Sequence, residues 1–245
     1  MATTARKYSL EPVAVPRVRT RHRRIVTKLP VPESLPLFER MERFEPASMQ
    51  GQPPVMIHRA KGWYVEDRWG NRWLDWSTGV LISNAGNGNP AIVAALRRAI
   101  RRPLLSTYVF PHADRAMLVE ELAALAPKGP DPRSASSPEG APRGADWRVF
   151  LLSTGSEACE NCIKLAKTWG LERHGPERRV FVSFKNGFHG RTMGAQLAGG
   201  MDGAKRWLGR PDDSFVQVPF PDGYKNPDTR FELFLETLAA KGVRP

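Results

Sequence analysis

The sequence is poor in cysteine and contains no long apolar run. Its two cysteines among 245 residues exclude the disulfide framework of small secreted domains and favour a reducing compartment. No apolar run approaches the roughly 20 residues that a membrane-spanning helix needs, and the N-terminus lacks the apolar core of an export signal. We therefore expect a cytoplasmic protein without a membrane segment.

Acidic residues are scarce at the start of the chain. Residues 1–30 hold eight Lys or Arg and one acid, Glu11, so they carry +7 of the net charge of +12. This basic, proline-rich arm could bind nucleic acid through phosphate contacts, target an organelle, or remain a solvated tail. No groove-reading or aromatic-interleaved motif accompanies the charge, which argues against nucleic acid as a partner.

The middle of the chain predicts a hairpin followed by two helices. Residues 62–76, GWYVEDRWGNRWLDW, place aromatic and β-branched residues on both sides of a turn at Gly70-Asn71. After a loop rich in glycine and asparagine, Asn89 and Pro90 favour the start of a helix that runs to residue 100. A second helix is expected over residues 114–125, ended by a proline.

The second half of the chain predicts an α/β fold. Residues 127–146 are rich in Pro, Gly, Ser and Ala and are expected to be a flexible insertion. After them the pattern reads strand (147–152), helix (from about residue 157), strand (178–184), which predicts a parallel β-α-β unit with a right-handed crossover. A last helix is expected over 229–242. The expected fold is therefore α/β, with a mainly parallel sheet between helices and a small antiparallel element before it.

Residues 153–169, STGSEACENCIKLAKTW, allow three interpretations. Apolar residues recur at helical spacing and polar residues precede them, which predicts a capped amphipathic helix. The C-x-x-C pair suits a redox site, although Cys159 lies about a turn inside the helix, and zinc would need two further ligands, so no metal site is expected. The third interpretation is a phosphate cradle, because Gly155 permits a tight turn and the helix start offers unpaired N–H groups.

The loop after the next strand favours the cradle. Residues 185–194, KNGFHGRTMG, place a flat aromatic ring at Phe188 and a two-pronged carboxylate clamp at Arg191, while Gly187 and Gly190 allow close backbone approach. Open α/β sheets bind ligands at the carboxyl ends of their strands, where both loops are expected. This combination suits a phosphorylated aromatic cofactor beside a carboxylate substrate.

These motifs together resemble one enzyme family. STGSEACENCIKLA and FHGRTMG, preceded by GWYVEDRWGNRWLDWSTGV and the GNGNP loop, are similar in content and order to the class III aminotransferases. These are pyridoxal-phosphate enzymes with the aspartate-aminotransferase fold (fold type I), and they include 4-aminobutyrate and ornithine aminotransferases. The resemblance extends from about residue 62 to the last helix.

The resemblance implies roles for particular residues. Gly155 and Ser156 would hold the cofactor phosphate, Phe188 would stack on the pyridine ring, and His189 would line the pocket beside it. Glu157 would belong to the helix start and help to position the turn.

The resemblance also implies substrate contacts and a domain organisation. Arg191 would bind the substrate carboxylate, and Thr78 and Gly79 would lie near the substrate entrance. The expected domains are a basic arm (1–45), the N-terminal part of a small domain with the hairpin (46–88) and the first part of the large cofactor-binding domain (89–245). A homodimer is expected from the same resemblance.

The chain departs from the family pattern in three respects, and the insertion over residues 127–146 is one of them. Asn87 and Asn89 stand where the family commonly has histidines in a GHxHP-like loop. The sequence reaches Pro245 without the family's acidic D-E-x-Q segment or its Schiff-base lysine, so the chain is expected to be the N-terminal half of such an enzyme, without catalytic residues and inactive alone. Five lysines lie outside the context that the family's Schiff-base lysine requires and are expected on helix surfaces or in loops: Lys164, Lys167, Lys185, Lys205 and Lys225.

The expected function is therefore transfer of an amino group from an amino acid or ω-amino acid to a 2-oxo acid, with pyridoxal 5'-phosphate as cofactor. Two alternatives stay open. One is a decarboxylase or aminomutase of the same fold. The other is a non-catalytic chain that keeps the cofactor cradle and the dimer surface.

Overall fold

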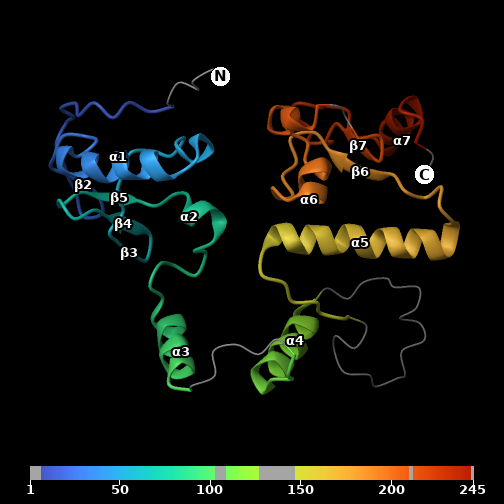
Figure 1. The fold of residues 1–245 in the computed structure, drawn as a ribbon, viewed down its shortest axis with the longest axis horizontal. Coiled ribbons are helices and arrows are strands. Elements are labelled where there is room, and N and C mark those ends of the chain that lie inside the picture. The colour runs from blue at the N-terminus through green and yellow to red at the C-terminus, as the bar shows by residue number, and fades with distance from the viewer. Residues whose placement is uncertain (1–6, 103–108, 127–146, 210–211, 244–245) are drawn as a thin grey trace. The chain divides into compact units, whose positions relative to one another are not determined.

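The computed structural model describes residues 7–102, 109–126, 147–209 and 212–243 (Figure 1). It contains two compact units, the N-terminal unit (Met1–Pro111) and the C-terminal unit (His112–Pro245). Across the described ranges, none of the helices combines the length and the apolarity that crossing a membrane requires. The insertion expected at 127–146 lies outside the described residues. The domain boundaries suggested by the family resemblance stay a prediction.

The N-terminal unit is built on a five-stranded antiparallel sheet. The hairpin predicted over residues 62–76 is confirmed, because β4 and β5 pair across a turn at 67–71 with Val65 opposite Trp73. The strands stand in the order β1-β2-β5-β4-β3. Their bounds are Val18–Arg19 (β1), Arg24–Ile25 (β2), Arg59–Lys61 (β3), Tyr64–Glu66 (β4) and Arg72–Leu74 (β5).

The basic arm is part of this sheet. Val13 and Leu29 exchange backbone hydrogen bonds of 3.0 and 3.1 Å, and the β1–β2 hairpin between them pairs with β5 through β2. Asn71, fully buried, accepts from the Val26 amide at 2.8 Å and donates to Thr27 Oγ1 at 2.7 Å. The interpretation of this segment as a solvated tail is therefore wrong for residues 13–29, because a side chain distant in sequence ties it down.

Helices and short 3-10 turns complete the N-terminal unit. The helix predicted from Asn89 is confirmed as α3, and the Asn89 side chain accepts from the Ala91 amide at 3.0 Å, with Pro90 at the first helical position. Its apolar residues Leu96 and Ile100 are exposed within the described part of the chain. The bounds are Pro32–Ser34 (η1), Leu35–Phe44 (α1), Ala47–Met49 (η2), Thr78–Leu81 (α2) and Pro90–Ile100 (α3).

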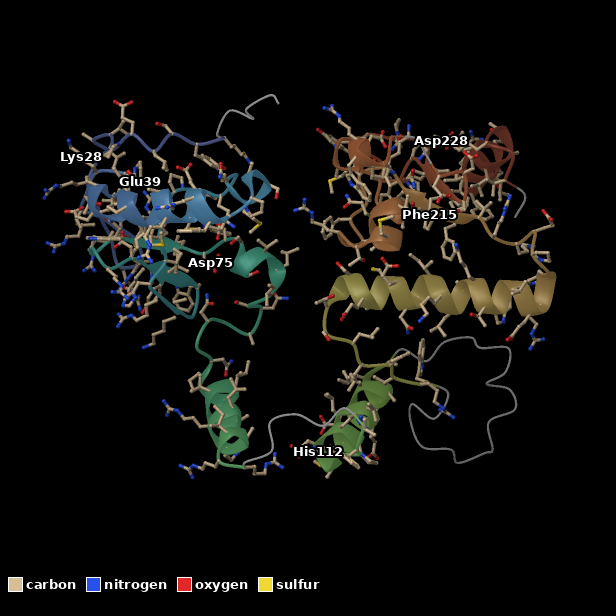
Figure 2. The ribbon with its side chains drawn as sticks, viewed as in Figure 1. Lys28, Glu39, Asp75, His112, Phe215 and Asp228 are labelled. Carbon is tan, nitrogen blue, oxygen red and sulfur yellow. The ribbon has the colours of Figure 1, made fainter. Side chains whose placement is uncertain are left out.

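The C-terminal unit contains four helices and two parallel strands among its described residues. The helices predicted to start at residue 114, at about residue 157 and at residue 229 are confirmed as α4, α5 and α7, which start at residues 113, 155 and 231. Phe215, labelled in Figure 2, stacks on Phe181 of the neighbouring strand with ring centroids 5.6 Å apart. The bounds are Ala113–Leu125 (α4), Gly155–His174 (α5), Phe181–Phe184 (β6), Met193–Ala198 (α6), Asp202–Leu208 (η4), Phe215–Val218 (β7) and Phe231–Ala240 (α7).

The expectation of a mainly parallel sheet is wrong for the described residues. The parallel part is the β6–β7 pair, whereas the five strands of the N-terminal unit are all antiparallel. Residues 147–152, expected to be the first strand of a β-α-β unit, form no strand, and their apolar side chains Phe150, Leu151 and Leu152 are exposed. An apolar run becomes a strand only when a neighbour satisfies its backbone, and no described strand pairs with this one.

Two small residues and a polar pair join α6 to the parallel strands. Ala195 and Ala198 are buried, and buried Ser183 on β6 donates to the Ala198 carbonyl at 2.6 Å. Gln217 on β7 donates to the Leu197 carbonyl at 3.2 Å. These side chains satisfy carbonyls that the end of a helix leaves without partners, and they anchor α6 close to the end of β6.

Candidate active site

The N-terminus of α5 is closed by a reciprocal capping box. The Glu157 amide donates to Thr154 Oγ1 at 3.2 Å, and Glu157 Oε2 accepts from the amides of Ser153 at 2.9 Å and Thr154 at 3.2 Å. The sequence placed Glu157 in this structural position, and the contacts confirm it. The carboxylate is folded back on the residues before the helix, so it stabilises the turn and leaves the first turn of the helix open.

Two amides remain without a helical acceptor at this end of α5. Gly155 and Ser156 are the first two helical residues, and the N–H groups of these positions find no carbonyl within the helix. The next two amides are satisfied, because Glu157 uses the Thr154 hydroxyl and Ala158 uses the Thr154 carbonyl at 3.0 Å. The free donors therefore lie at the two residues that the resemblance assigns to a phosphate.

The loop between β6 and α6 packs directly against these two residues. Ser156 Oγ accepts from the Arg191 amide at 3.3 Å. A Cβ on Gly190 would lie 2.8 Å from the Cβ and 2.9 Å from the Cα of Ser156, and Gly190 has a φ of 132°. Only glycine meets both conditions, because it has no Cβ and tolerates positive φ. The structure therefore brings together the two loops that the sequence singled out.

The loop presents its functional groups to solvent. The Phe188 side chain is 66% exposed, and Arg191 is exposed as well. His189 is half-buried, and together with its neighbours and with Gln196, Met201 and Ala204 it lines a pocket of about 180 Å³. This volume lies below the roughly 300–1,000 Å³ of complete ligand sites, so the loop supplies one wall of a site.

Sequence reasoning missed Glu160, which holds the far end of this loop. Its Oε1 accepts from Thr192 Oγ1 at 2.6 Å and from the Ala195 amide at 3.0 Å. The Thr192 hydroxyl, followed by the Ala195 and Gly194 amides, lowers the pKa of this carboxyl. The only sequence signals for this contact are an acidic residue in the second turn of α5 and a threonine directly after Arg191. Neither forms a recognisable motif.

Thr78 and Gly79, expected near the substrate entrance, lie in the N-terminal unit in a left-handed turn. Thr78, Gly79, Val80 and Leu81 have φ angles of 49°, 64°, 62° and 66°. β-branched residues rarely adopt this conformation, so α2 is a strained element. The Thr78 hydroxyl is buried and has no hydrogen-bond partner.

Asp75, labelled in Figure 2, organises this turn from its base. Its carboxylate accepts from the Ser77 hydroxyl at 2.8 Å, the Ser77 amide at 3.1 Å and the Asn87 side chain at 3.3 Å. The Ser77 hydroxyl, then the Asn87 amide and the backbone N–H groups of the turn, hold the pKa of Asp75 below its usual value against the effect of burial. The strained turn therefore wraps around a charged centre.

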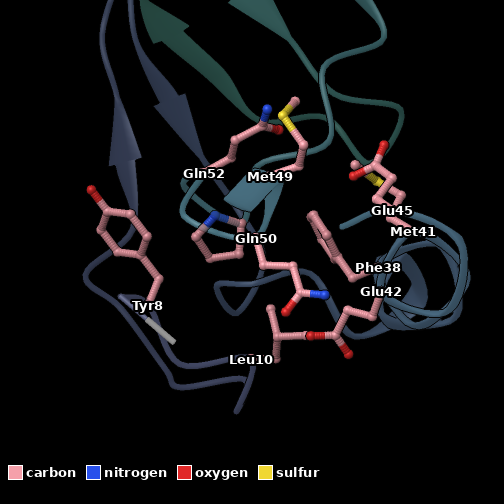
Figure 3. Close-up of a pocket in the computed structure, with 10 residues that line it drawn as sticks. Tyr8, Leu10, Phe38, Met41, Glu42, Glu45, Met49, Gln50 and Gln52 are labelled. Atoms are coloured by element: carbon pink, nitrogen blue, oxygen red, sulfur yellow. The ribbon is translucent and has the colours of Figure 1, made fainter. Parts of the chain in front are cut away.

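A separate small pocket lies in the N-terminal unit between α1 and the residues that precede β1 (Figure 3). Phe38, Met41 and Met49 give it an apolar lining, with Glu42 and Glu45 beside them. Its volume of about 50 Å³ accommodates little more than one or two waters. It holds none of the residues that the sequence assigned to a site.

Comparison with known proteins identifies the chain's family. A family model described as "Aminotransferase class-III" matches residues 47–240. The chain belongs to this family. It is 29% identical over 171 residues to 4-aminobutyrate aminotransferase of Mycobacterium leprae, covering 69% of this chain and 34% of that protein. It is 31% identical over 189 residues to acetylornithine aminotransferase of Xanthomonas axonopodis pv. citri, covering 77% of this chain and 40% of that protein.

Solved structures show the same fold. Taurine:2-oxoglutarate aminotransferase from Bifidobacterium kashiwanohense, in complex with PLP and glutamate, aligns with a TM-score of 0.65 and 24% identity over 89% of this chain and 46% of that one. The class-III family is one of pyridoxal-phosphate enzymes, so this is the family's cofactor. The predicted family, its α/β fold and its cofactor are therefore confirmed. The chain spans between a third and a half of the length of the two relatives above.

The two asparagines that depart from the class-III pattern have structural partners. Asn87 donates to the Gly62 carbonyl at 3.2 Å as well as to Asp75, and it bridges the hairpin to the loop before α3. Asn89 donates to the Ala85 carbonyl at 2.9 Å while it caps α3. Both side chains therefore stabilise the loop conformation.

The cysteines of this class-III chain do not form a redox site, and two of its lysines lie on the surface of α5 as expected. Cys159 and Cys162 are free, and burial, with smaller effects from Cys162 and Glu160, raises the pKa of the Cys159 thiol. A redox cysteine needs a lowered pKa, so the raised pKa of Cys159 argues against the interpretation of the C-x-x-C pair as a redox site. Lys164 and Lys167 are exposed on α5 as expected. Lys205 is not a surface lysine, because its side chain is 15% exposed and donates to Gln217 at 3.1 Å.

Proposed function

We propose that this chain forms the phosphate-binding part of an aminotransferase site, in a protein that moves an amino group from an amino acid or ω-amino acid to a 2-oxo acid. One observation carries the proposal. The loop bearing Phe188 and Arg191 packs on Ser156, beside the two free amides of α5. Family membership and relatives named 4-aminobutyrate and acetylornithine aminotransferase support the reaction class.

The start of α5 fits the phosphate of pyridoxal phosphate. The Gly155 and Ser156 amides would donate to phosphate oxygens, and the Ser156 hydroxyl, which accepts from Arg191, still has its own proton to donate. The positive end of the helix dipole favours a dianion at this point. Because Glu157 is turned back in the capping box, its charge is held by the amides of Ser153 and Thr154.

The loop supplies the remaining contacts. The exposed Phe188 ring would stack on the pyridine ring, His189 would line the pocket beside it, and Arg191 would bind a substrate carboxylate through its planar guanidinium. When bound, the cofactor supplies the electron-accepting ring on which amino transfer depends. The chain's own residues hold and orient it.

Further expectations stay proposals. Thr78 and Gly79 would line the substrate entrance, and the strained turn with its unpartnered hydroxyl is consistent with a ligand contact. The complete protein would be a cytoplasmic homodimer, as expected from the sequence. The 245-residue chain is expected to bind the cofactor without transamination.

A titration with pyridoxamine phosphate tests the proposal. This cofactor form has no aldehyde, so it forms no adducts with surface lysines, and pyridoxamine without the phosphate is the matched ligand. By calorimetry we expect the 245-residue chain to bind pyridoxamine phosphate at least about tenfold more tightly than pyridoxamine, since hydrogen bonds to charged groups contribute about 1.5–3 kcal/mol each.

Variants locate the binding. Ser156→Ala should weaken the binding of pyridoxamine phosphate by about tenfold, because it removes a hydroxyl donor and the anchor of the Arg191 amide. Thr168→Ala removes a hydroxyl farther along the same helix, where it donates to the Lys164 carbonyl, and should leave the affinity unchanged. Equal affinity for the two ligands, or indifference to Ser156→Ala, would show that the phosphate binds elsewhere or not at all.

A further inference from the structure

The carboxylate of Glu160 joins three parts of the C-terminal unit. It projects from α5, accepts from the Thr192 hydroxyl at 2.6 Å at the end of the Phe188–Arg191 loop, and accepts from the Ala195 amide at 3.0 Å in α6. The Gly194 amide contributes as well. Charge-assisted hydrogen bonds of this length are among the stronger polar contacts in proteins, so the end of the loop is firmly tied to α5.

The backbone opposite Glu160 is shaped for this contact. A Cβ on Gly194 would collide with Glu160 Oε2 and lie 3.3 Å from Ile163 Cδ1, so any larger residue would displace the Glu160 carboxylate or move α6 away from α5. The missing side chain lets the backbone amides approach the carboxylate. The close contact between Glu160 and the start of α6 therefore depends on glycine at position 194.

Glu160 closes a loop that is already held at two other points. At its start, the Asn186 amide donates to the Gly200 carbonyl at 3.0 Å, and at its middle the Arg191 amide donates to Ser156. Among the hydrogen bonds of the described residues, only those of Ser156 and Glu160 join α5 to this loop. Without Glu160, none of the described hydrogen bonds would join the segment that follows Arg191 to a side chain of α5.

We propose that Glu160 is a positioning residue for the site: by holding Thr192 and the start of α6, it sets where the Phe188 ring and the Arg191 guanidinium stand relative to the free amides of α5. It acts through these residues and need not touch the ligand. This role rests on the proposed function. Its structural part, the hold on the loop, can be measured without any ligand.

The direction in which Glu160→Ala changes the affinity for pyridoxamine phosphate distinguishes a positioning role from a purely electrostatic one. A carboxylate near the start of α5 repels a phosphate, so loss of its charge alone would tighten the binding of pyridoxamine phosphate. If positioning dominates, Glu160→Ala weakens binding instead, because the loop no longer holds its place. We expect a loss of affinity of about tenfold or more, comparable to the loss of one charge-assisted hydrogen bond.

Two measurements on the 245-residue chain test the proposal. The first is deuterium uptake of the backbone amides of residues 187–196 without ligand, and the second is calorimetric affinity for pyridoxamine phosphate. Glu160→Ala and Thr192→Val should raise the deuterium uptake and weaken binding. Thr192→Ser keeps the hydroxyl, so its uptake and affinity should match those of the unmodified chain. Glu172→Gln removes an equal charge from an exposed position on the same helix and should change neither.

A double variant completes the design. The effects of Glu160→Ala and Thr192→Val should not add, because both remove the same contact. Tighter binding by Glu160→Ala, or unchanged uptake in residues 187–196, would overturn the positioning role. If the unmodified chain binds no pyridoxamine phosphate, the proposed function fails, while the uptake and its rescue by Thr192→Ser still decide whether Glu160 holds the loop.

Discussion

The two units of this chain are ordered by different means. The N-terminal unit holds 18 Lys or Arg against 8 Asp or Glu, a charge of +10, and the C-terminal unit holds 19 against 17, a charge of +2. Among the described residues, the buried polar or charged side chains of the N-terminal unit are Ser34, Glu66, Asp67 and Asn71, whereas the C-terminal unit has Ser183. The buried apolar residues are Ile25 and Val31 in the first unit and Ala195, Ala198, Phe215, Val218 and Leu238 in the second.

This difference shows which contacts stabilise each unit, and therefore which substitutions should destabilise it. Strands of two or three residues bury little apolar surface, so the register of the N-terminal sheet depends on a few side-chain hydrogen bonds. The C-terminal unit depends on small residues that let α6 approach its neighbours closely. The loop between β6 and α6 also depends on small residues, since Gly190 packs on Ser156 and Gly194 packs on Glu160.

The largest effect is expected at Asn71. Its side chain also donates to Asp67 Oδ2 at 2.6 Å, so Asn71→Ala removes the hydrogen bonds to the Val26 amide, to Thr27 Oγ1 and to Asp67 Oδ2 together. We expect about 3 kcal/mol of lost stability in the N-terminal unit. Ser183→Ala, the corresponding change in the C-terminal unit, should cost about 1 kcal/mol there.

Hydrogen exchange measured separately for the two units checks both values. Asn84→Ala, at an exposed position of the N-terminal unit, serves as the control and should change little. If Asn71→Ala and Ser183→Ala cost the same, the proposed contrast between the units is wrong.

A smaller change, this time a gain in stability, is expected from a substitution in the left-handed turn at residues 78–81. Val80→Gly relieves a strain of about 1–2 kcal/mol at a φ of 62°, and this exceeds the roughly 0.4–1 kcal/mol by which glycine favours the unfolded chain. The N-terminal unit should therefore gain about 0.5–1 kcal/mol. Val93→Gly, inside α3, should destabilise the same unit. Urea unfolding of both variants checks the signs, and a loss of stability in Val80→Gly would show that the turn is not strained.

The smallest effect concerns acid stability. Glu66 is 6% exposed and accepts from Arg59 at 2.7 Å and Arg72 at 2.7 Å, and these hydrogen bonds lower its pKa. Its contribution is therefore fully present above its unfolded pKa of about 4.3 and is lost as the pH falls through the lowered folded value.

Urea midpoints measured from pH 7 to pH 3 test this linkage. Glu66→Gln should lower the stability of the N-terminal unit at pH 7 and reduce its further loss below about pH 4.3, with part of the slope remaining because the pKa of Asp75 is lowered too. An unchanged acid slope would indicate that solvent screens the arginine pair, since Arg59 is mostly exposed.

Local sequence signals predicted much of the fold and of the candidate site. The hairpin around Gly70-Asn71, the capped starts of α3 and α5 and the final helix depend on residues within a few positions of one another, and the structure confirms them. The two loops of the site were found because their glycines, caps and aromatic residue form compact motifs. The strand expected at 147–152 was wrong, because a strand needs a partner that local sequence does not specify.

The sequence by itself determined the family, the approximate starts of α3, α4, α5 and α7 and the identity of the two loops, because these depend on short-range spacing and on motif order. Only the tertiary structure decided that Asn71 ties the basic arm into a sheet, that Thr78–Leu81 turns left-handed around Asp75, and that Glu160 holds the loop through Thr192. Each of these contacts joins residues whose side chains have no shared pattern in the sequence. Their partners become evident only when the chain has folded and buried or unpaired polar groups must be satisfied.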